Sequence, residues 1–96
     1  MVIVTMDFDR WYWLSIQLGK FAEKKAHKVW SYLRDKIRRE GVGDLKYAIS
    51  LEFSKAEHAR LMEVTRDVIV NTKWVSEECL ASSVYNSLVD AYNEYA

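Results

Sequence analysis

The side chains best suited to chemistry in this sequence are cationic, and most of them gather in one stretch. Residues 20–39 hold eight Lys or Arg against two acids, Glu23 and Asp35. Residues 74–96 hold four acids and no base, although the formal net charge of the whole chain is zero. Clustered Lys and Arg attract phosphate groups, but a solvated helix face is the plainer explanation of such a pattern. The charge distribution therefore suggests an anionic partner without identifying it.

No catalytic or metal-binding motif accompanies these charges. The sequence has no Gly-rich phosphate loop, nucleophile elbow, paired-carboxylate site or His-Glu metal motif. Cys79 has no second cysteine to pair with, so a buried thiol is expected. His58 follows Glu57 near an expected helix start, but no second ligand stands four residues on, so a solvated imidazole is expected. We therefore expect no enzyme, no cofactor, no metal and no small-molecule substrate.

Two segments alternate apolar and polar residues with the period of a strand that buries one face. The apolar positions are Val2, Val4, Met6 and Phe8 in the first segment, and Leu45, Tyr47, Ile49, Leu51 and Phe53 in the second. We therefore expect strands within residues 2–8 and 47–53.

Each strand is followed by a residue that can cap a helix. Asp9 follows the first strand, and Ser54 follows the second and forms a capping box with Glu57. These caps predict helices that begin at Arg10 and Lys55. A turn near residues 24–26 separates the first two helices, and Gly41 and Gly43 end the first half of the chain.

The second half repeats this order. Asn71 and Thr72 end its first helix, and Ser76 can cap the last one. Four helical stripes are expected to be buried. They consist of Trp11, Leu14, Leu18, Phe21 and Ala22; Val29, Trp30, Leu33 and Ile37; Leu61, Met62, Thr65, Val68 and Ile69; and Leu80, Val84, Leu88 and Tyr92.

Three consecutive aromatic residues, Trp11, Tyr12 and Trp13, cannot all face inward from one helix. Trp11 shares the side of Leu14 and should belong to the core. Trp13 points roughly opposite, so it is a candidate for contact with a protein partner or a second copy, although packing against a lysine stem explains it equally well. Tyrosines of the last helix suit packing or self-association better than catalysis.

One short phrase occurs twice in the chain. VTMDFDR at 4–10 and ISLEFSK at 49–55 agree in residue kind at an offset of 45, whereas the final helices align near an offset of 51. A unit of one strand and two helices leaves strand edges unpaired, so two copies should pair. We expect one α+β, mostly α domain, 1–96, in which repeats 1–43 and 44–96 form a two-stranded antiparallel ribbon on a four-helix core.

These residues resemble the ribbon-helix-helix DNA-binding proteins of the Arc, MetJ and CopG kind. ISLEFSKAEHARL resembles the strand and first helix of that family, and Ser76-x-Glu78-x-Leu80-x-x-Ser83-Val84 resembles the start of its second helix. KVWSYLRDKI stands where the second helix of the first copy should be. The resemblance implies a single-chain tandem regulator, similar to those of some plasmids and archaeal viruses. It implies a sequence-specific transcription regulator or repressor whose partner is duplex DNA.

The resemblance also implies which residues contact DNA. The family inserts its ribbon into the major groove and clamps phosphate at the start of its second helix. Outward residues expected to contact bases are Ile3, Thr5, Asp7, Ala48, Ser50 and Glu52. Residues expected to contact phosphate are Lys24, Lys25, His27, Lys28, Lys73 and Ser76, with the first copy holding more firmly because Glu77 and Glu78 lie in the second site.

An alternative function uses the same fold without much DNA binding. Asp7 and Glu52 stand where the family often has Arg or Lys, and a carboxylate facing DNA is repelled unless it accepts a bond from a cytosine amino group. These acids and the acidic final helix favour a protein-binding module, antitoxin-like or inhibitory. Neither function involves a membrane: no apolar run is long enough to span one and no leader is visible, so a soluble cytoplasmic protein is expected.

Overall fold

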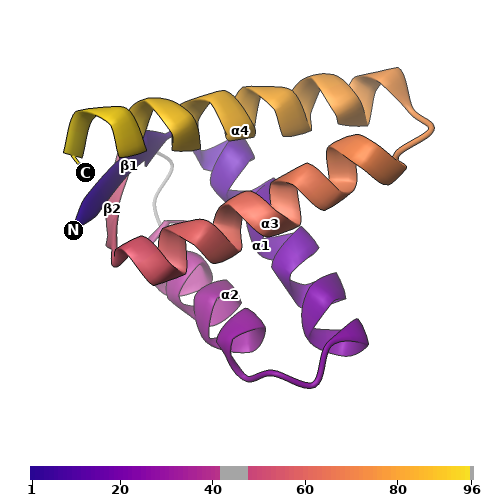
Figure 1. The fold of residues 1–96 in the computed structure, drawn as a ribbon, viewed down its shortest axis with the longest axis horizontal. Helices are drawn as coiled ribbons and strands as arrows, with labels where there is room; N and C mark the ends of the chain where they lie inside the picture. Colours follow the sequence, from indigo (N-terminus) through magenta and orange to yellow (C-terminus); the bar gives the residue numbers. More distant parts are fainter. Residues whose placement is uncertain (42–47, 96) are drawn as a thin grey trace. The chain divides into compact units, whose positions relative to one another are not determined.

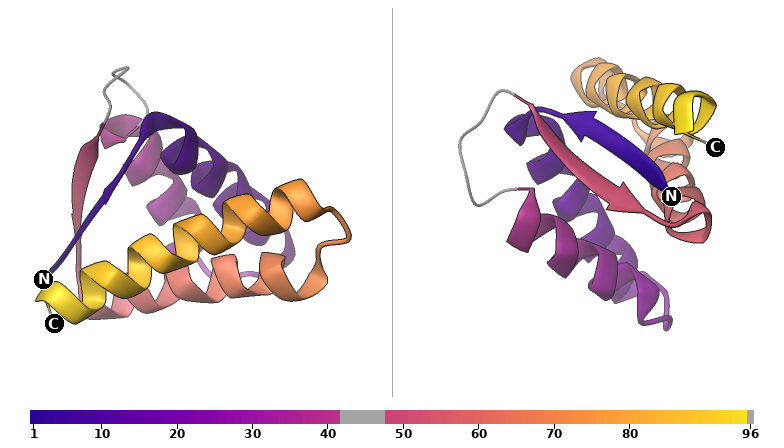
Figure 2. Two further views of the ribbon diagram at one scale, coloured as in Figure 1. Left: turned by 90° about the horizontal axis from the view of Figure 1, so that it is seen from above. Right: turned by 90° about the vertical axis from the view of Figure 1, so that its left-hand side faces the viewer.

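The structure, a computed structural model, describes residues 1–41 and 48–95. Its elements are β1 (Val2–Met6), α1 (Phe8–Lys24), α2 (Val29–Glu40), β2 (Ile49–Phe53), α3 (Lys55–Asn71) and α4 (Val75–Tyr95), as Figure 1 shows. β1 and β2 pair as a two-stranded antiparallel sheet and lie side by side in both views of Figure 2. The α+β, mostly helical class predicted from the sequence is confirmed. The predicted strand start at residue 47 and the repeat boundary after residue 43 fall outside the described residues.

The chain divides into two compact units, and each contains one pair of helices. One unit comprises Met1–Val4 and Glu52–Ala96, and the other comprises Thr5–Leu51. α3 packs on α4 in the first unit, and α1 packs on α2 in the second. The division passes through both strands, so each unit takes one end of each strand.

The two strands have one buried and one exposed face. Val2, Val4 and Met6 of β1 are buried. Leu51 and Phe53 of β2 are buried in the same alternating way. The hydroxyl oxygens of Thr5 and Ser50 lie 2.7 Å apart on the exposed face, which places these two residues opposite each other. The alternation predicted from the sequence is therefore confirmed within β1 and for residues 50–53 of β2, whereas Ile49, expected on the buried face, is half-buried.

Asp7, and not the predicted Asp9, caps the first helix. The Asp7 carboxylate accepts a 2.9 Å hydrogen bond from the Arg10 backbone N–H and also pairs with the Arg10 guanidinium. Consequently α1 begins at Phe8, two residues before the predicted start at Arg10. The extended backbone of Asp7 ends the strand, and Phe8 then stacks on Tyr12 one helical turn later, with ring centroids 6.0 Å apart.

The predicted start of α3 is confirmed in detail. The Ser54 hydroxyl accepts a 3.1 Å hydrogen bond from the Glu57 N–H, and the Glu57 carboxylate accepts a 2.8 Å bond from the Ser54 N–H. This reciprocal arrangement is the capping box that the sequence predicts.

The two halves match at a different offset from the one that the repeated phrase suggests. β1 and β2 have five residues each and begin at Val2 and Ile49, so they are related by 47 positions rather than 45. α1 and α3 have 17 residues each and obey the same offset. The last helices, α2 and α4, begin at Val29 and Val75, 46 positions apart rather than about 51. The first strand and helix of the two halves therefore match in length and order at one offset, although the residue types match best at another.

The predicted ends of α1 and α3 agree with the structure, whereas the predicted cap of α4 does not. α1 ends at Lys24 and α3 ends at Asn71, as expected. Ser76, however, lies inside the first turn of α4 and does not cap it. Trp74 precedes that helix, and its backbone N–H donates a 3.2 Å hydrogen bond to the Thr72 hydroxyl. The Thr72 hydroxyl thus accepts a bond from the backbone just before α4, whereas the sequence analysis expected the Ser76 side chain to cap this helix.

Burial on α4 follows the predicted stripe at Val84 and Leu88 and departs from it at both ends. The buried residues are Ala81, Val84, Leu88 and Ala91. Tyr92, which was expected inward, is 44% exposed, and Cys79, expected to be buried, is exposed. Leu80, also expected inward, is half-buried, and the small residues Ala81 and Ala91 occupy the buried face in place of Leu80 and Tyr92.

A matched pair of glycine substitutions tests the packing of α1 and α2. Gly19→Ala is expected to raise the free energy of unfolding by up to about 1 kcal/mol, because a Cβ inside α1 would meet only Arg34 Cδ at an ordinary 3.5 Å. Gly41→Ala is expected to lower it by about 1–3 kcal/mol, because its Cβ would lie 3.0 Å from the Ile37 carbonyl oxygen and 3.1 Å from Leu51 Cδ1. Urea unfolding followed by circular dichroism measures both. A shift of the two variants in the same direction would contradict this packing.

Candidate nucleic-acid interface

The exposed face of the sheet carries two neighbouring hydroxyl groups. Thr5 and Ser50 are both exposed, and their hydroxyls share one hydrogen bond. Each hydroxyl has one proton and two lone pairs, so after this bond the pair retains one donor and several acceptor positions. Glu52 is also exposed on β2, Ile3 is half-buried on β1, and Ala48 is exposed just before β2. All six residues expected to contact bases, Asp7 included, are therefore at least partly open to solvent.

Asp7, the sixth residue expected to contact bases, lies beyond the end of β1. Its carboxylate is occupied by the Arg10 backbone N–H and guanidinium. The sequence analysis placed Asp7 on the strand because the alternation continues to Phe8, but Asp7 caps α1 instead. Within the described strands, Glu52 is thus the one carboxylate on the exposed face.

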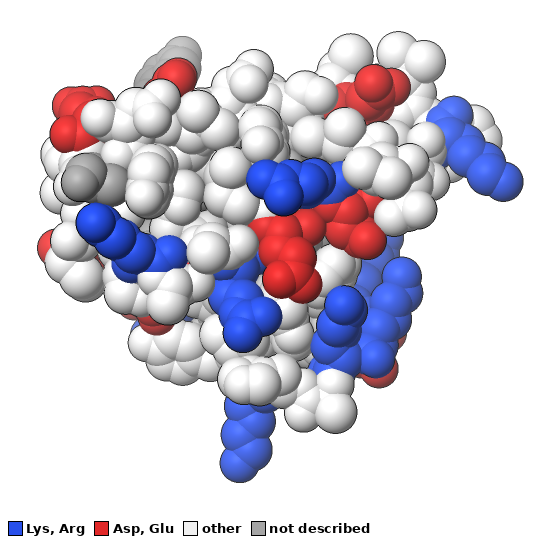
Figure 3. Space-filling model, in the orientation of Figure 1, with Lys and Arg blue, Asp and Glu red and all other residues white. Residues whose placement is uncertain are grey.

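A basic cluster occupies the connection between α1 and α2. Its members are all exposed and comprise Lys24, Lys25, His27 and Lys28. The Lys25 ammonium lies 5.5 Å from the centre of the Phe21 ring, which keeps its stem along the helix. In Figure 3, Lys and Arg side chains project from the part of this face where α1, α2 and their connection lie.

The start of α2 within this cluster suits an anion. Lys28, the residue before α2, provides no side-chain cap, and the first turn of the helix contains no acid. Instead, His27 Nδ1 accepts a 3.0 Å hydrogen bond from the Val29 N–H. The unpaired N–H groups of a first helical turn carry partial positive charge, which the neighbouring lysines reinforce.

The equivalent position at the start of α4 is less favourable for an anion. Lys73 and Ser76 are exposed there, as expected for phosphate contacts. Glu77 and Glu78, however, lie in the first turn of α4, where acids stabilise the helix end and repel phosphate. This asymmetry agrees with the expectation that the first copy would hold DNA more firmly, which stays a prediction.

Among the described residues, the most exposed apolar side chains lie where the sequence analysis did not place them. Trp74 and Val75 are 73% and 75% exposed, and Val70 is 74% exposed, all around the α3–α4 connection. Trp13 is half-buried, and Tyr12 is the exposed member of the aromatic triplet, whereas Trp11 is fully buried as predicted. Trp74 could have been found from the sequence, because it lies between the helix end at Asn71 and the next apolar stripe.

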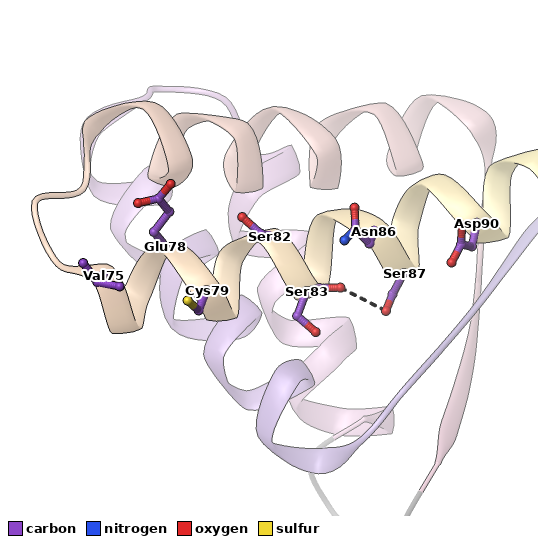
Figure 4. A pocket seen from close by; sticks show the side chains of 8 residues that line it. All are labelled: Val75, Glu78, Cys79, Ser82, Ser83, Asn86, Ser87 and Asp90. Carbon is purple, nitrogen blue, oxygen red and sulfur yellow. Dashed lines mark hydrogen bonds between the residues drawn. The ribbon is translucent and has the colours of Figure 1, made fainter.

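One face of α4 is hollowed and lined by small polar side chains, which Figure 4 shows from close by. The Ser87 hydroxyl donates a 3.2 Å hydrogen bond to the Ser83 carbonyl, so it is satisfied within the helix. The lining residues all come from α4 and are Val75, Glu78, Cys79, Ser82, Ser83, Asn86, Ser87 and Asp90. In the part of the chain that the structure describes, no group of three or more His, Cys, Asp or Glu residues could hold a metal ion.

His58 is buried rather than solvated, contrary to the expectation from the sequence. It is 3% exposed, its Nε2 lies 2.7 Å from the Leu88 carbonyl oxygen, and its ring stacks on Tyr92. Since a carbonyl only accepts, Nε2 carries the proton and donates. The spacing of His58, Leu61 and Thr65 places this imidazole on the buried stripe of α3, a signal that was present in the sequence.

Comparison with known proteins leaves the family open. No protein-family model matches the sequence, and no curated protein or solved structure is significantly similar to it. Over residues 1–41 and 48–95, no helix is long and apolar enough to cross a membrane.

Proposed function

We propose that this protein is a sequence-specific transcription regulator that binds duplex DNA, with a tandem ribbon-helix-helix fold completed within one chain. The exposed face of β1 and β2 would enter the major groove, and the basic cluster of Lys24, Lys25, His27 and Lys28 would contact phosphate. The pairing of the two strands, with Thr5 opposite Ser50 on the exposed face, is the observation that carries this proposal.

The side chains of the exposed face support two kinds of base contact, namely hydrogen bonds to base edges and apolar contacts with thymine methyl groups. The major groove is wide enough for a two-stranded ribbon, and hydroxyl groups can donate to or accept from base edges there. Apolar side chains such as Ile3 and Ala48 suit the thymine methyl group. The Glu52 carboxylate would be tolerated in the groove only where it accepts a hydrogen bond from a donor such as the cytosine amino group. It would therefore restrict the DNA sequences that bind.

α1 separates the ribbon from the basic cluster that would contact phosphate. α1 has 17 residues and therefore extends about 25 Å from the end of β1 to the basic cluster. In the proposed complex, the exposed lysines at the start of α2 would contact the phosphate backbone outside the groove that the ribbon occupies. Phosphate contacts would supply most of the affinity, and the ribbon would supply the choice of sequence.

The experiment that tests this function is a selection of binding sites from random duplex DNA, followed by mobility shifts at two salt concentrations. We expect a defined sequence to be recovered and its binding to weaken as salt increases. The double substitution Thr5→Val/Ser50→Ala is expected to weaken the selected site about tenfold or more and to leave binding to random duplex unchanged. Ser82→Ala on α4 is the control and should change neither. Absence of binding at both salt concentrations would refute the proposal.

A second candidate function, binding of a protein partner, is favoured by the apolar side chains at the α3–α4 connection. Val70, Trp74 and Val75 are each about three-quarters exposed, and exposed aromatic side chains are common anchors of protein interfaces. Recovery of a stable protein partner without nucleic acid, lost on Trp74→Ala, would select this function over DNA binding.

A further inference from the structure

A groove between α3 and α4, within one compact unit, has no part in the proposed function. It is bordered by one stripe of α3 and by the C-terminal half of α4. Its lining residues are His58, Ala59, Met62, Glu63, Arg66, Val89, Tyr92 and Asn93.

Two side-chain pairs bridge the helices at the ends of this groove. At one end the rings of His58 and Tyr92 stack, with centroids 5.4 Å apart. At the other end the Arg66 guanidinium lies 5.9 Å from the centre of the Tyr85 ring, and its Nη2 donates a long 3.4 Å bond to the Tyr85 hydroxyl. Arg66 follows His58 by eight positions along the helix, so the groove is about 12 Å long between its bridges.

The middle of the groove is apolar and adaptable. Met62 and Val89 line it from opposite helices and are half-buried. Methionine adapts to the shape of a ligand and makes favourable contacts with aromatic rings. Tyr92 leaves 44% of its surface open beside them. A flat apolar group of one or two fused rings matches this length and lining.

The Arg66 end of the groove attracts an anion. Among the described residues, no acid forms an ion pair with Arg66, whose polar contact is the neutral Tyr85 hydroxyl. The groove-lining acid Glu63 lies 3.7 Å from the guanidinium of Arg60 instead. A guanidinium presents paired N–H donors that match the two oxygens of a carboxylate.

We propose that this groove binds a small planar aromatic carboxylate. The ring lies over Met62 and against Tyr92, and the carboxylate accepts hydrogen bonds from Arg66. The orientation follows from the groove itself, since its apolar middle leads to a cation at one end and to a stacked, hydrogen-bonded His58 at the other.

The test uses the full chain, labelled with ¹⁵N and at methionine methyl groups, and titrates it with 2-naphthoate. We expect saturable shifts of Met62, Val89 and Tyr92 signals with a Kd of about 1 mM or tighter. The neutral 2-naphthamide has the same shape and should bind at least tenfold more weakly. Arg66→Gln should remove this preference for the acid and leave amide binding unchanged, whereas Lys55→Gln, a control on the same helix, should leave the preference intact.

Three results would overturn the proposal. The first is the absence of shifts at the groove, including the case in which naphthoate shifts only the basic cluster between α1 and α2. The second is equal binding of acid and amide by the unaltered protein. The third is an unchanged preference in Arg66→Gln, whose exposed side chain can be replaced without loss of core packing and whose folded state the same spectra verify. None of these results depends on whether the protein binds DNA.

Discussion

Trp11→Ala is expected to lower the free energy of unfolding by about 3–5 kcal/mol, the largest effect of any single substitution considered for this chain. Trp11 is fully buried, and its Nε1 donates a 2.9 Å hydrogen bond to the Ile49 carbonyl oxygen. The substitution removes a large core side chain and one link between α1 and β2. A domain of this length has a total stability of about 5–14 kcal/mol, so much of it would be lost. Urea unfolding followed by circular dichroism measures the change.

Two further variants separate the causes of this effect. Trp11→Phe keeps an aromatic ring but leaves the Ile49 carbonyl without the indole donor, so a loss of about 1–3 kcal/mol is expected. Trp13→Ala removes the same side chain from a half-buried position on the same helix and should cost less than Trp11→Ala. Equal losses for Trp11→Ala and Trp13→Ala would contradict the central place of Trp11 in the core.

The second large effect concerns DNA affinity and depends on the proposed function. Lys24→Gln/Lys28→Gln removes two exposed cations that precede the start of α2. Each phosphate contact contributes about one to the slope of log affinity against log salt, so the slope should fall by about two. Binding should weaken for all duplex sequences alike, because phosphate contacts carry no sequence information. Mobility shifts or fluorescence anisotropy over a salt series measure both quantities.

A matched control removes the same charge from the opposite end of α2. Arg38→Gln/Arg39→Gln changes two exposed cations of the last turn, where the helix end is partially negative. This variant should keep most of the salt slope. If both double variants reduce the slope equally, binding depends on overall charge and not on the start of α2.

The strands were the most predictable part of the fold. Alternation has a period of two, so an error of two residues in the repeat offset, 45 instead of 47, left every strand residue on its correct face. The exposed positions of Thr5 and Ser50 could therefore be predicted without the correct alignment. The capping box of Ser54 and Glu57 was equally predictable, because it is a local pattern independent of the rest of the chain.

The first helix start was harder to predict, because two acids compete for it. Asp7 and Asp9 are both good caps, and the alternation of the strand continues through Phe8. What decides between them is that Asp7 reaches both the N–H and the guanidinium of Arg10, and that Phe8 gains a stacking partner in Tyr12. Both contacts depend on the geometry of the formed helix, so the sequence alone does not show which acid makes them.

Most of the helix residues that were predicted to be buried are buried, and the misplaced side chains have consequences for function. Large residues were favoured for burial on α4, whereas Ala81 and Ala91 occupy the packed face and leave Tyr92 beside it. Tyr92 then stacks on His58, which the sequence analysis expected in solvent. The groove between α3 and α4 could not be predicted, since it depends on how two helices pack and not on a pattern within either.

Each compact unit contains one end of β1 and one end of β2, so neither half of the chain can form the sheet alone. A polypeptide cut between α2 and β2 would yield two pieces, each with an unsatisfied strand edge that invites aggregation. The pieces would regain the sheet only by meeting, so their recovery would depend on concentration. In the uncut chain the two strands are covalently linked, so each is present at a high effective concentration near the other. Formation of the sheet therefore does not depend on the protein concentration.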